Sequence, residues 1–449
     1  MSTTIAPPPD TAAPATWAPE DALFWERHGK RLAWRTLTIT TFDLLLAFAT
    51  WFMVSALVVR LEGVGFRYST AQLFWLTAMP GLAGGTFRII HMFLVPIFGT
   101  RATVTWATLS LVIPCVGWGL AVQDPATPFA VLLLLAFLAG LGGGNFSSFM
   151  PSTSLFFPKR LQGTALGIQA GIGNLGVSVT QFLVPWIISA AALGSLVGTP
   201  QTFVKAGQTS EIYLQNAAYI WIPFVLFGTA AAWCLLKSVP VRASFLQQTD
   251  IFRQKHTWVM TSLYIMTFGS FSGFAAIFPL LIKKIYGDFE NAPDPLTYAF
   301  LGPLVGSVAR ILFGPVSDRF GGGRVTQISG VGMLACAIGV TFFTEPASLS
   351  AFPGFLACML GLFFFSGIGN ASTFKQIPAI FPARQAGGVI GWTAAVAAYG
   401  PFLFSVFIGL ILAVTGAPTW FFYAVALFYI ANVGLNWWYY VRPGAERPC

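Results

Sequence analysis

The stretch GLGGGNFSSFMPSTSLFFPKRLQGTALGIQAGIGNLGVSVTQFL, residues 140–183, contains two apolar, glycine-rich segments separated by the polar run FPKR at 157–160. A second stretch, GIGNASTFKQIPAIFPARQAGGVIGWTAAVAAYG at residues 367–400, has the same arrangement around FPAR at 381–384. With their flanks, these segments reach about 20 residues, which is the length a helix needs to cross ~30 Å of hydrocarbon. Each stretch therefore indicates two transmembrane helices joined by a short polar loop.

Both stretches belong to a longer internal repeat. The FPKR and FPAR runs are 224 residues apart, and Asn145 and Asn370 are 225 apart. Arg88 and Arg310, each preceded by a pair of Pro and Gly, are 222 apart. Three landmarks in the same order at nearly one spacing indicate a duplicated unit. Parallel halves of this kind build transporters whose binding site lies between them, near the middle of the bilayer.

The composition supports a membrane protein. Of the 449 residues, 56% are hydrophobic and only 9% are charged, whereas a soluble domain is about 25% charged. The mean hydropathy is +0.73. These values exclude a soluble enzyme and a disordered scaffold. Because the net charge of +9 comes without any basic run, we expect no nucleic-acid partner; an excess of Lys and Arg in cytoplasmic loops explains the charge instead.

Apolar stretches of 20 or more residues recur twelve times from residue 37 onward, the second at 71–97. The sequence therefore predicts an all-α membrane protein with twelve transmembrane helices in two pseudo-symmetric six-helix halves. The expected parts are a cytoplasmic tail and interfacial helix at 1–36, an N-terminal half at 37–237, a cytoplasmic linker at 238–256, a C-terminal half at 257–441 and a cytoplasmic tail at 442–449.

Loop charges predict the orientation. With the N-terminus inside, the inner segments hold sixteen Lys and Arg residues, whereas the outer loops hold only Arg60, Arg67, Lys205, Lys283 and Lys284. Cytoplasmic loops are enriched in positive charge. Both termini are therefore expected in the cytoplasm.

Two arginines form the core of the predicted site. Arg88 lies in the second predicted helix, about ten residues and so roughly 15 Å from its inner end, and Arg310 takes the matching place in the eighth. A charge at that depth is costly and usually functional. Asp43 is the only acidic residue in a predicted helix, so neither arginine has an evident counterion. Two guanidinium groups facing one cavity would bind a flat oxyanion, whose geometry their planar forks match.

Small and amide residues in the glycine-rich helices are candidates for gating or packing. Without side chains, glycines let helices pack closely and slide, while buried amides need partners from a neighbouring helix or from substrate. The candidates are Gly144, Asn145, Gly171, Gly173, Gly369, Asn370 and Gly400.

The run GPVSDRFGGGR at 314–324 follows the eighth predicted helix. It resembles the G-x-x-x-D-R-x-G-G loop motif of the major facilitator superfamily. Asp318 and the arginines of this run, including Arg319, are expected to latch helix ends together in one conformation and to release them in another.

With these pieces, the chain resembles the nitrate/nitrite porter family of the major facilitator superfamily. Residues 140–183 and 367–400 are similar to the two copies of its nitrate signature, and the likeness covers nearly the whole chain. The resemblance implies a twelve-helix carrier of nitrate and nitrite in a bacterial inner membrane.

The resemblance also implies roles at a substrate site. Arg88 and Arg310 would clamp the anion from opposite halves. Asn174 and Tyr264 would hydrogen-bond it. Three aromatic rings would sandwich the planar ion and exclude water: those of Phe48, Phe146 and Phe268.

Two more polar residues lie near these positions. His91 stands three residues after Arg88, on nearly the same helix face, and a packed or hydrogen-bonded role is expected for it. Lys375, some six residues from the inner surface, is expected to snorkel or to line the inner vestibule and draw anions.

The leading functional hypothesis is exchange of nitrate for nitrite by alternating access, in a monomer surrounded by membrane lipid. The first alternative is proton-coupled nitrate symport, for which Asp43 and His91 are the titratable candidates. A less favoured alternative is a transporter-like anion sensor. Because the sequence has no His, Cys or acidic cluster with metal-ligand spacing and no nucleophile–base pair, we expect neither an enzyme nor a bound metal or cofactor.

Overall fold

The computed structural model describes residues 17–189, 197–205, 208–239 and 246–449. Within these ranges, twelve helices are long and apolar enough to cross a membrane. Large apolar side chains cover the outside of the bundle, including Trp106, Phe227 and Val414, which are 62%, 66% and 77% exposed. Exposed apolar surface of this extent fits contact with lipid. The predicted all-α, multi-pass membrane fold is therefore confirmed.

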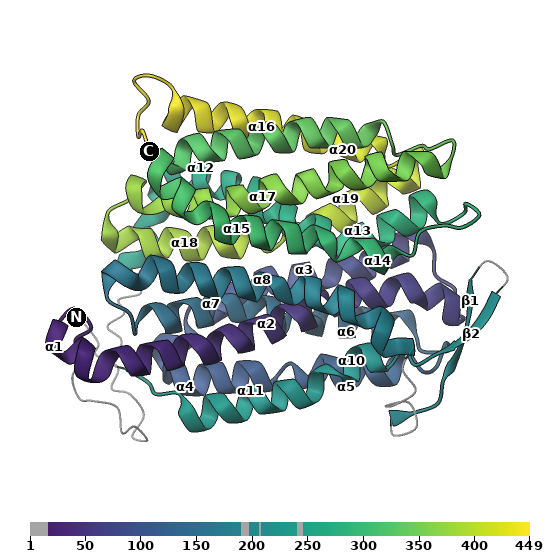
Figure 1. Cartoon of the computed structure of the whole chain (residues 1–449), viewed down its shortest axis with the longest axis horizontal. Coiled ribbons are helices and arrows are strands. Elements are labelled where there is room, and N and C mark those ends of the chain that lie inside the picture. The colour runs from purple at the N-terminus through teal and green to yellow at the C-terminus, as the bar shows by residue number, and fades with distance from the viewer. Residues whose placement is uncertain (1–16, 190–196, 206–207, 240–245) are drawn as a thin grey trace.

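The N-terminal half contains six spans, coloured purple to teal in Figure 1. They consist of α1 (Ala22–Phe24), the π-helix η1 (Trp25–Gly29), α2 (Lys30–Leu61) and the 3-10 turn η2 (Glu62–Val64); α3 (Thr70–His91); α4 (Leu94–Leu109) and α5 (Val112–Ala121); α6 (Phe129–Ala139) and α7 (Leu141–Ser154); α8 (Lys159–Ser189); and α10 (Asn216–Tyr219) and α11 (Trp221–Leu235).

The C-terminal half, coloured green to yellow, follows the 3-10 segment η3 (Leu246–Arg253). Its spans consist of α12 (Lys255–Tyr264), the π-helix η4 (Ile265–Gly269) and α13 (Ser270–Tyr286); α14 (Pro295–Ala299) and α15 (Leu301–Phe320); α16 (Gly322–Thr341); η5 (Leu349–Ala351) and α17 (Phe352–Ile380); α18 (Ala383–Ala397) and α19 (Gly400–Thr415); and α20 (Thr419–Asn436) and η6 (Trp437–Val441).

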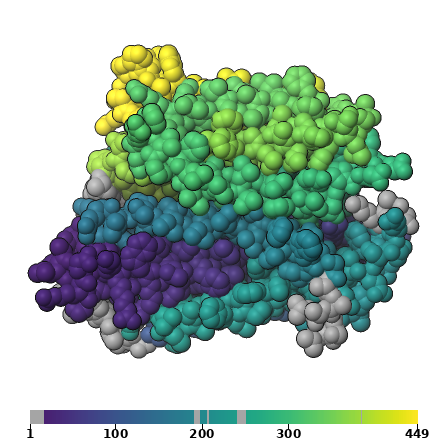
Figure 2. Space-filling model, in the orientation of Figure 1, coloured from purple at the N-terminus to yellow at the C-terminus, as the bar shows by residue number. Residues whose placement is uncertain are grey.

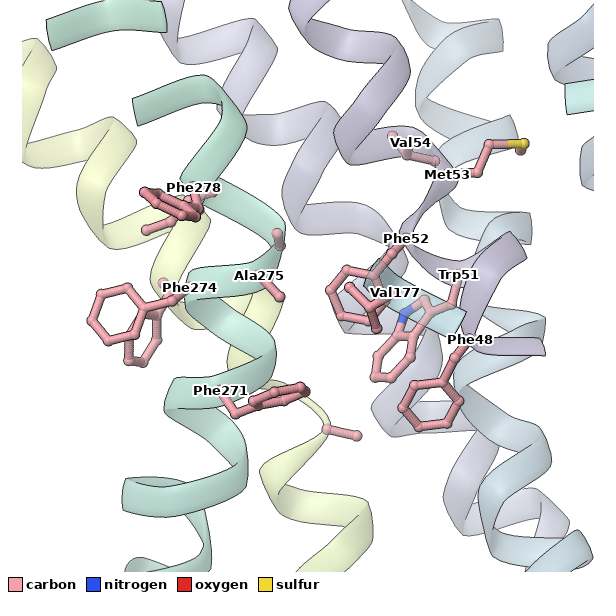
Figure 3. Packing of buried hydrophobic residues seen from close by; sticks show 14 of the residues in the cluster. Phe48, Trp51, Phe52, Met53, Val54, Val177, Phe271, Phe274, Ala275 and Phe278 are labelled. Atoms are coloured by element: carbon pink, nitrogen blue, oxygen red, sulfur yellow. The ribbon is translucent and has the colours of Figure 1, made fainter. Parts of the chain in front are cut away.

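The two halves lie against each other as stacked layers (Figures 1 and 2). They meet along the pairs α2–α13, α3–α19 and α8–α15. Glycines allow this approach, since a Cβ on Gly81 would collide with the backbone of Phe402 in the other half. Figure 3 shows Phe52 on α2 and Ala275 on α13 on facing sides of the seam, and both belong to one buried apolar cluster.

The first span begins earlier than predicted. Residues Ala22–Leu61 form one continuous helical run through the π-turn η1, so there is no separate interfacial helix ending near residue 36. Trp25 is buried and its ring centroid lies 5.9 Å from that of Phe157. The aromatic residues of this run therefore pack on the loop between α7 and α8. Residues 1–16 and 240–245 of the predicted tail and linker lie outside the described residues.

Two further features differ from the sequence prediction. The second span, expected at 71–97, is broken after His91 and then turns at Gly99, whose φ of 76° ends the helical path. An antiparallel hairpin of β1 (Gln201–Lys205) and β2 (Gln208–Ile212), which was not expected, lies between the fifth and sixth spans. It sits at the end of the bundle opposite to α1 and the C-terminal end (Figure 1).

Candidate functional site

Arg88, on α3, is fully buried and spans the seam between the halves. Its Nε donates to the carbonyl of Gly143 on α7 at 2.9 Å, and one terminal nitrogen donates to the carbonyl of Ala394 on α18 at 2.7 Å. Nη2 has no hydrogen-bond partner. The guanidinium carbon lies 4.5 Å from the ring centroid of Phe146 and 5.0 Å from that of Phe268. The group is thus fixed, with one nitrogen left for a ligand.

Arg310, on α15, is also buried, and its Nη1 has no partner. Its guanidinium carbon lies 5.3 Å from the ring centroid of Phe374. The hydroxyl of Tyr264 lies near this guanidinium without a hydrogen bond of ordinary geometry. The charges of Arg88 and Arg310 are close enough to act on each other. Among the described ion pairs, none includes either arginine.

A layer of aromatic rings connects the two arginines. Phe48 and Phe146 have centroids 6.3 Å apart, and Phe146 stacks on Phe268 at 6.5 Å with 29° between planes. Phe268 stacks on Tyr264 at 5.5 Å, and Tyr264 on Phe374 at 4.6 Å. The layer runs from the N-terminal half into the C-terminal half. It brings together the aromatic residues predicted for the substrate site.

Sequence reasoning missed two aromatic members of this site. Phe374 extends the layer on the Arg310 side. Trp51 donates from its indole N–H to the carbonyl of Pro80 at 2.8 Å, and its ring centroid lies 5.6 Å from the Arg88 guanidinium carbon. Helical spacing could have indicated both, because Trp51 lies three residues after Phe48 and Phe374 four residues after Asn370.

The predicted amides differ in their surroundings. Neither amide atom of Asn174 or of Asn370 has a partner, although both side chains are fully buried. Asn174 lies one helical turn after Gly171, which contacts Ile311 beside Arg310. Asn145 instead donates to the carbonyl of Ala107 at 3.3 Å, within the N-terminal half. Unsatisfied buried amides usually signal an absent partner, such as a ligand or water.

The predicted packing glycines all stand where helices come close. A Cβ would collide with a neighbour at each one: Gly144 with Phe87, Gly171 with Ile311, Gly173 with Leu44, Gly369 with Thr267 and Gly400 with Gly269. The contact of Gly171 crosses the seam from α8 to α15, next to Arg310.

Asp318, which is expected to hold helix ends together, lies on α15 and contacts α17. Its carboxylate pairs with Lys375 of α17 at 2.8 Å, while the guanidinium carbon of Arg319 lies 5.5 Å from the ring centroid of Phe320. Lys375 is therefore an ion-pair partner within the C-terminal half. His91 is buried, with Nδ1 2.9 Å from the Ser148 hydroxyl, so it is hydrogen-bonded as expected.

Two parallel six-helix halves with a buried polar cluster between them are an architecture typical of secondary transporters. The family model described as Major Facilitator Superfamily matches residues 39–373. The chain belongs to the nitrate/nitrite porter family of the Major Facilitator Superfamily. Members of this family are transporters, which confirms that the protein is a carrier and not an enzyme.

Similar proteins cover almost the whole chain. The Probable nitrate/nitrite antiporter NarK2 of Thermus thermophilus is 66% identical over 96% of this chain and 97% of its own. The Nitrate/nitrite transporter NarU of Escherichia coli K12 is 40% identical over 95% and 96%. Among solved structures, a bacterial homologue of the human lysosomal transporter Spinster in an inward-facing and occupied conformation superposes with a TM-score of 0.65. Its 15% identity, over 89% of this chain and 95% of that one, shows a shared fold only.

Proposed function

We propose that the protein exchanges nitrate for nitrite across the membrane. One observation carries this proposal: two buried guanidinium groups, one from each half, each leave a nitrogen without a partner. A buried cation without a counterion is costly, and a small oxoanion between Arg88 and Arg310 would supply that counterion. The names of the relatives, a nitrate/nitrite antiporter and a nitrate/nitrite transporter, support the same substrates.

The aromatic layer fits a planar ion. The centroids of Phe146 and Phe268 lie 6.5 Å apart, and two van der Waals contacts of about 3.5 Å each add up to nearly this spacing. A flat anion would slip between the rings with only slight widening, while the layer excludes water. Asn174 and Tyr264 bear free polar groups that would hydrogen-bond its oxygens.

Charge neutralisation would couple binding to movement. Without an anion, Arg88 and Arg310 repel each other across the seam, and closure of the halves is opposed. With an anion between them, the halves can close and rock, and the close-packed glycines Gly171 and Gly400 let helices slide during this motion. An empty carrier would return slowly, so exchange is favoured over one-way transport.

We place this carrier in a bacterial inner membrane, and the loop charges support an orientation with both ends of the chain in the cytoplasm. Under this orientation, the end of the bundle that bears the β1–β2 hairpin is the outer side. A monomer is the proposed working unit, because the site is complete within one chain.

Counterflow tests the exchange. Purified protein is reconstituted into liposomes with or without internal nitrite, and uptake of isotope-labelled nitrate is measured. Uptake is expected only into nitrite- or nitrate-loaded vesicles, and Arg88→Ala or Arg310→Ala should abolish it. Normal uptake by a protein with both arginines replaced by alanine would refute the proposed site.

Proton-coupled symport is the second candidate, because Asp43 is the only buried acid among the described residues. Neither of its carboxyl oxygens has a hydrogen bond of ordinary geometry. However, this carboxyl packs against Gly228 of α11, inside the N-terminal half, and not in the aromatic layer. Symport predicts nitrate uptake into anion-free vesicles under an inward proton gradient, and loss of that uptake in Asp43→Asn.

A further inference from the structure

Five charged side chains join the two halves at the end of the bundle that bears the hairpin. Arg60 and Glu62 come from the end of the first span, Lys283 and Lys284 from the end of α13, and Asp294 from the N-cap of α14. We call this group the outer lock. We propose that the outer lock holds the outer side closed, and that on opening its lysine pair receives the incoming small anion in place of Glu62.

The ion pairs of the outer lock all cross the seam. Arg60 lies 2.7 Å from the Asp294 carboxylate. The two oxygens of Glu62 lie 2.6 Å from the Lys283 ammonium and 3.3 Å from that of Lys284. The N-terminal half supplies one partner of each pair and the C-terminal half the other. Any movement that parts the halves at this end must therefore break all three pairs.

These pairs are better shielded than ordinary surface pairs. The side chains of Arg60 and Lys283 are 9% and 24% exposed. Phe203 of the β1–β2 hairpin covers the Arg60 guanidinium, with 5.4 Å between its ring centroid and the guanidinium carbon. Lys283 also donates to the carbonyl of Val59 across the seam at 2.9 Å. Partial burial reduces screening by salt and makes such pairs stronger than exposed ones.

Neutral hydrogen bonds continue the closed seam from the outer lock toward the site. Ser178 of α8 donates to the carbonyl of Phe300, at 2.9 Å, and Gln181 donates to the carbonyl of Ala275 at the same distance. Ser178 is only 4% exposed. It would become accessible from outside once the halves part, which makes it a reporter position.

Opening would divide the charges of the outer lock unequally. On the N-terminal half, Arg60 and Glu62 balance each other. On the C-terminal half, Lys283 and Lys284 outweigh Asp294 by one charge. The lysines lose the carboxylate of Glu62 at the moment that the passage opens, and a small anion is a suitable replacement. Anion capture by the lysines rests on the proposed anion transport. Closure of the outer side by the outer lock can be measured without substrate.

The first experiment measures how firmly the outer lock keeps the outer side closed. In a protein whose five native cysteines are replaced by serine, Ser178→Cys is labelled with a membrane-impermeant maleimide from the outer side, without nitrate or nitrite. Adding Glu62→Gln is expected to speed labelling about tenfold, which corresponds to ~1.4 kcal/mol of lost closure. Asp294→Asn, which can still cap α14, should act in the same direction. Arg67→Gln, a matched change outside the outer lock, should label at the parent rate.

The second experiment tests whether the lysine pair of the outer lock binds the incoming anion. The half-saturation concentration for external nitrate is determined in counterflow at low and at high salt. Both Glu62→Gln and Lys284→Gln should speed labelling, but Glu62→Gln should lower the half-saturation concentration and Lys284→Gln should raise it at low salt. High salt should shrink this difference, because it screens exposed lysines.

The outcomes are separable. Labelling at the parent rate in both Glu62→Gln and Asp294→Asn would overturn the proposal that the outer lock holds the outer side closed. Shifts of the half-saturation concentration in the same direction for Glu62→Gln and Lys284→Gln would overturn anion capture by the lysines. Loss of transport by Arg88 variants concerns the proposed function alone, since the labelling assay needs no substrate.

Discussion

Replacing each site arginine by lysine separates charge from geometry. Lysine keeps the positive charge but offers one compact ammonium group in place of a planar fork. At Arg88, two nitrogens already donate to the carbonyls of Gly143 and Ala394, and Nη2 remains for substrate. A single ammonium cannot reach both carbonyls and the anion from the same backbone position. Arg88→Lys should therefore lose the anion contact and at least one bond that fixes the side chain.

The size of this effect follows from the bonds involved. A hydrogen bond to a charged group contributes about 1.5–3 kcal/mol, so two lost bonds cost roughly 3–6 kcal/mol. At ~1.4 kcal/mol for each factor of ten, transport should fall at least a hundredfold. At Arg310, no backbone hydrogen bond is found within the described structure, so Arg310→Lys should lose the anion contact while the fold keeps its stability.

The two variants therefore differ in a second measurement. Nitrate counterflow should fall in both, whereas the melting temperature in detergent should fall clearly only for Arg88→Lys, whose bonds hold α3 to α7 and α18. The parent protein and Lys205→Arg, a change in the β1–β2 hairpin, serve as controls. Transport near the parent rate in Arg310→Lys, or an unchanged melting temperature in Arg88→Lys, would contradict the geometry described above.

Gly171→Val should press on Ile311 across the seam and reduce exchange severalfold in counterflow, whereas Gly167→Val, in open space on the same helix, should not. Asp43→Asn should leave nitrate counterflow unchanged, because exchange of anions moves no proton. A large loss of counterflow in a variant that keeps its melting temperature would show that this carboxyl takes part in transport. The hydrogen bond with Lys255 lowers the pKa of the Glu446 carboxyl. The contact therefore stabilises the folded protein fully at pH values above the ordinary pKa of 4.5, and this stabilisation is lost as the pH falls through the lowered pKa. Thermal melting between pH 7 and 3 should therefore show less acid sensitivity in Glu446→Gln.

Hydrophobicity predicted the twelve spans well because a bilayer imposes one length on every helix that crosses it. The start of the first span was less predictable. Aromatic and basic residues near Trp25 suit a membrane surface, but Trp25 packs against Phe157, a residue more than a hundred positions away. The hairpin was missed for a related reason, since Phe203 is held by packing on Gly63 and not by a strong local strand pattern.

The site residues likewise fall into those that the sequence indicates and those that only the fold brings together. The duplication pointed to Arg88 and Arg310 because a charge deep in a membrane helix is rare and stands out. Composition alone did not single out the aromatic layer, because the chain has 44 Phe. The family resemblance indicated Phe48, Phe146 and Phe268, whereas only the fold shows that Phe374 stacks on Tyr264. The pairing of Asp318 with Lys375 likewise depends on how α15 meets α17.

The bond from Arg88 to Ala394 has a thermodynamic consequence. One nitrogen of the guanidinium belongs to a contact between the halves, while another is free for a ligand. Whatever factor seam closure contributes to ligand affinity, the ligand must contribute to seam closure, because linkage is reciprocal. Two substrates that bind the Arg88 guanidinium with different affinity will therefore also give different populations of the conformation in which the seam is closed.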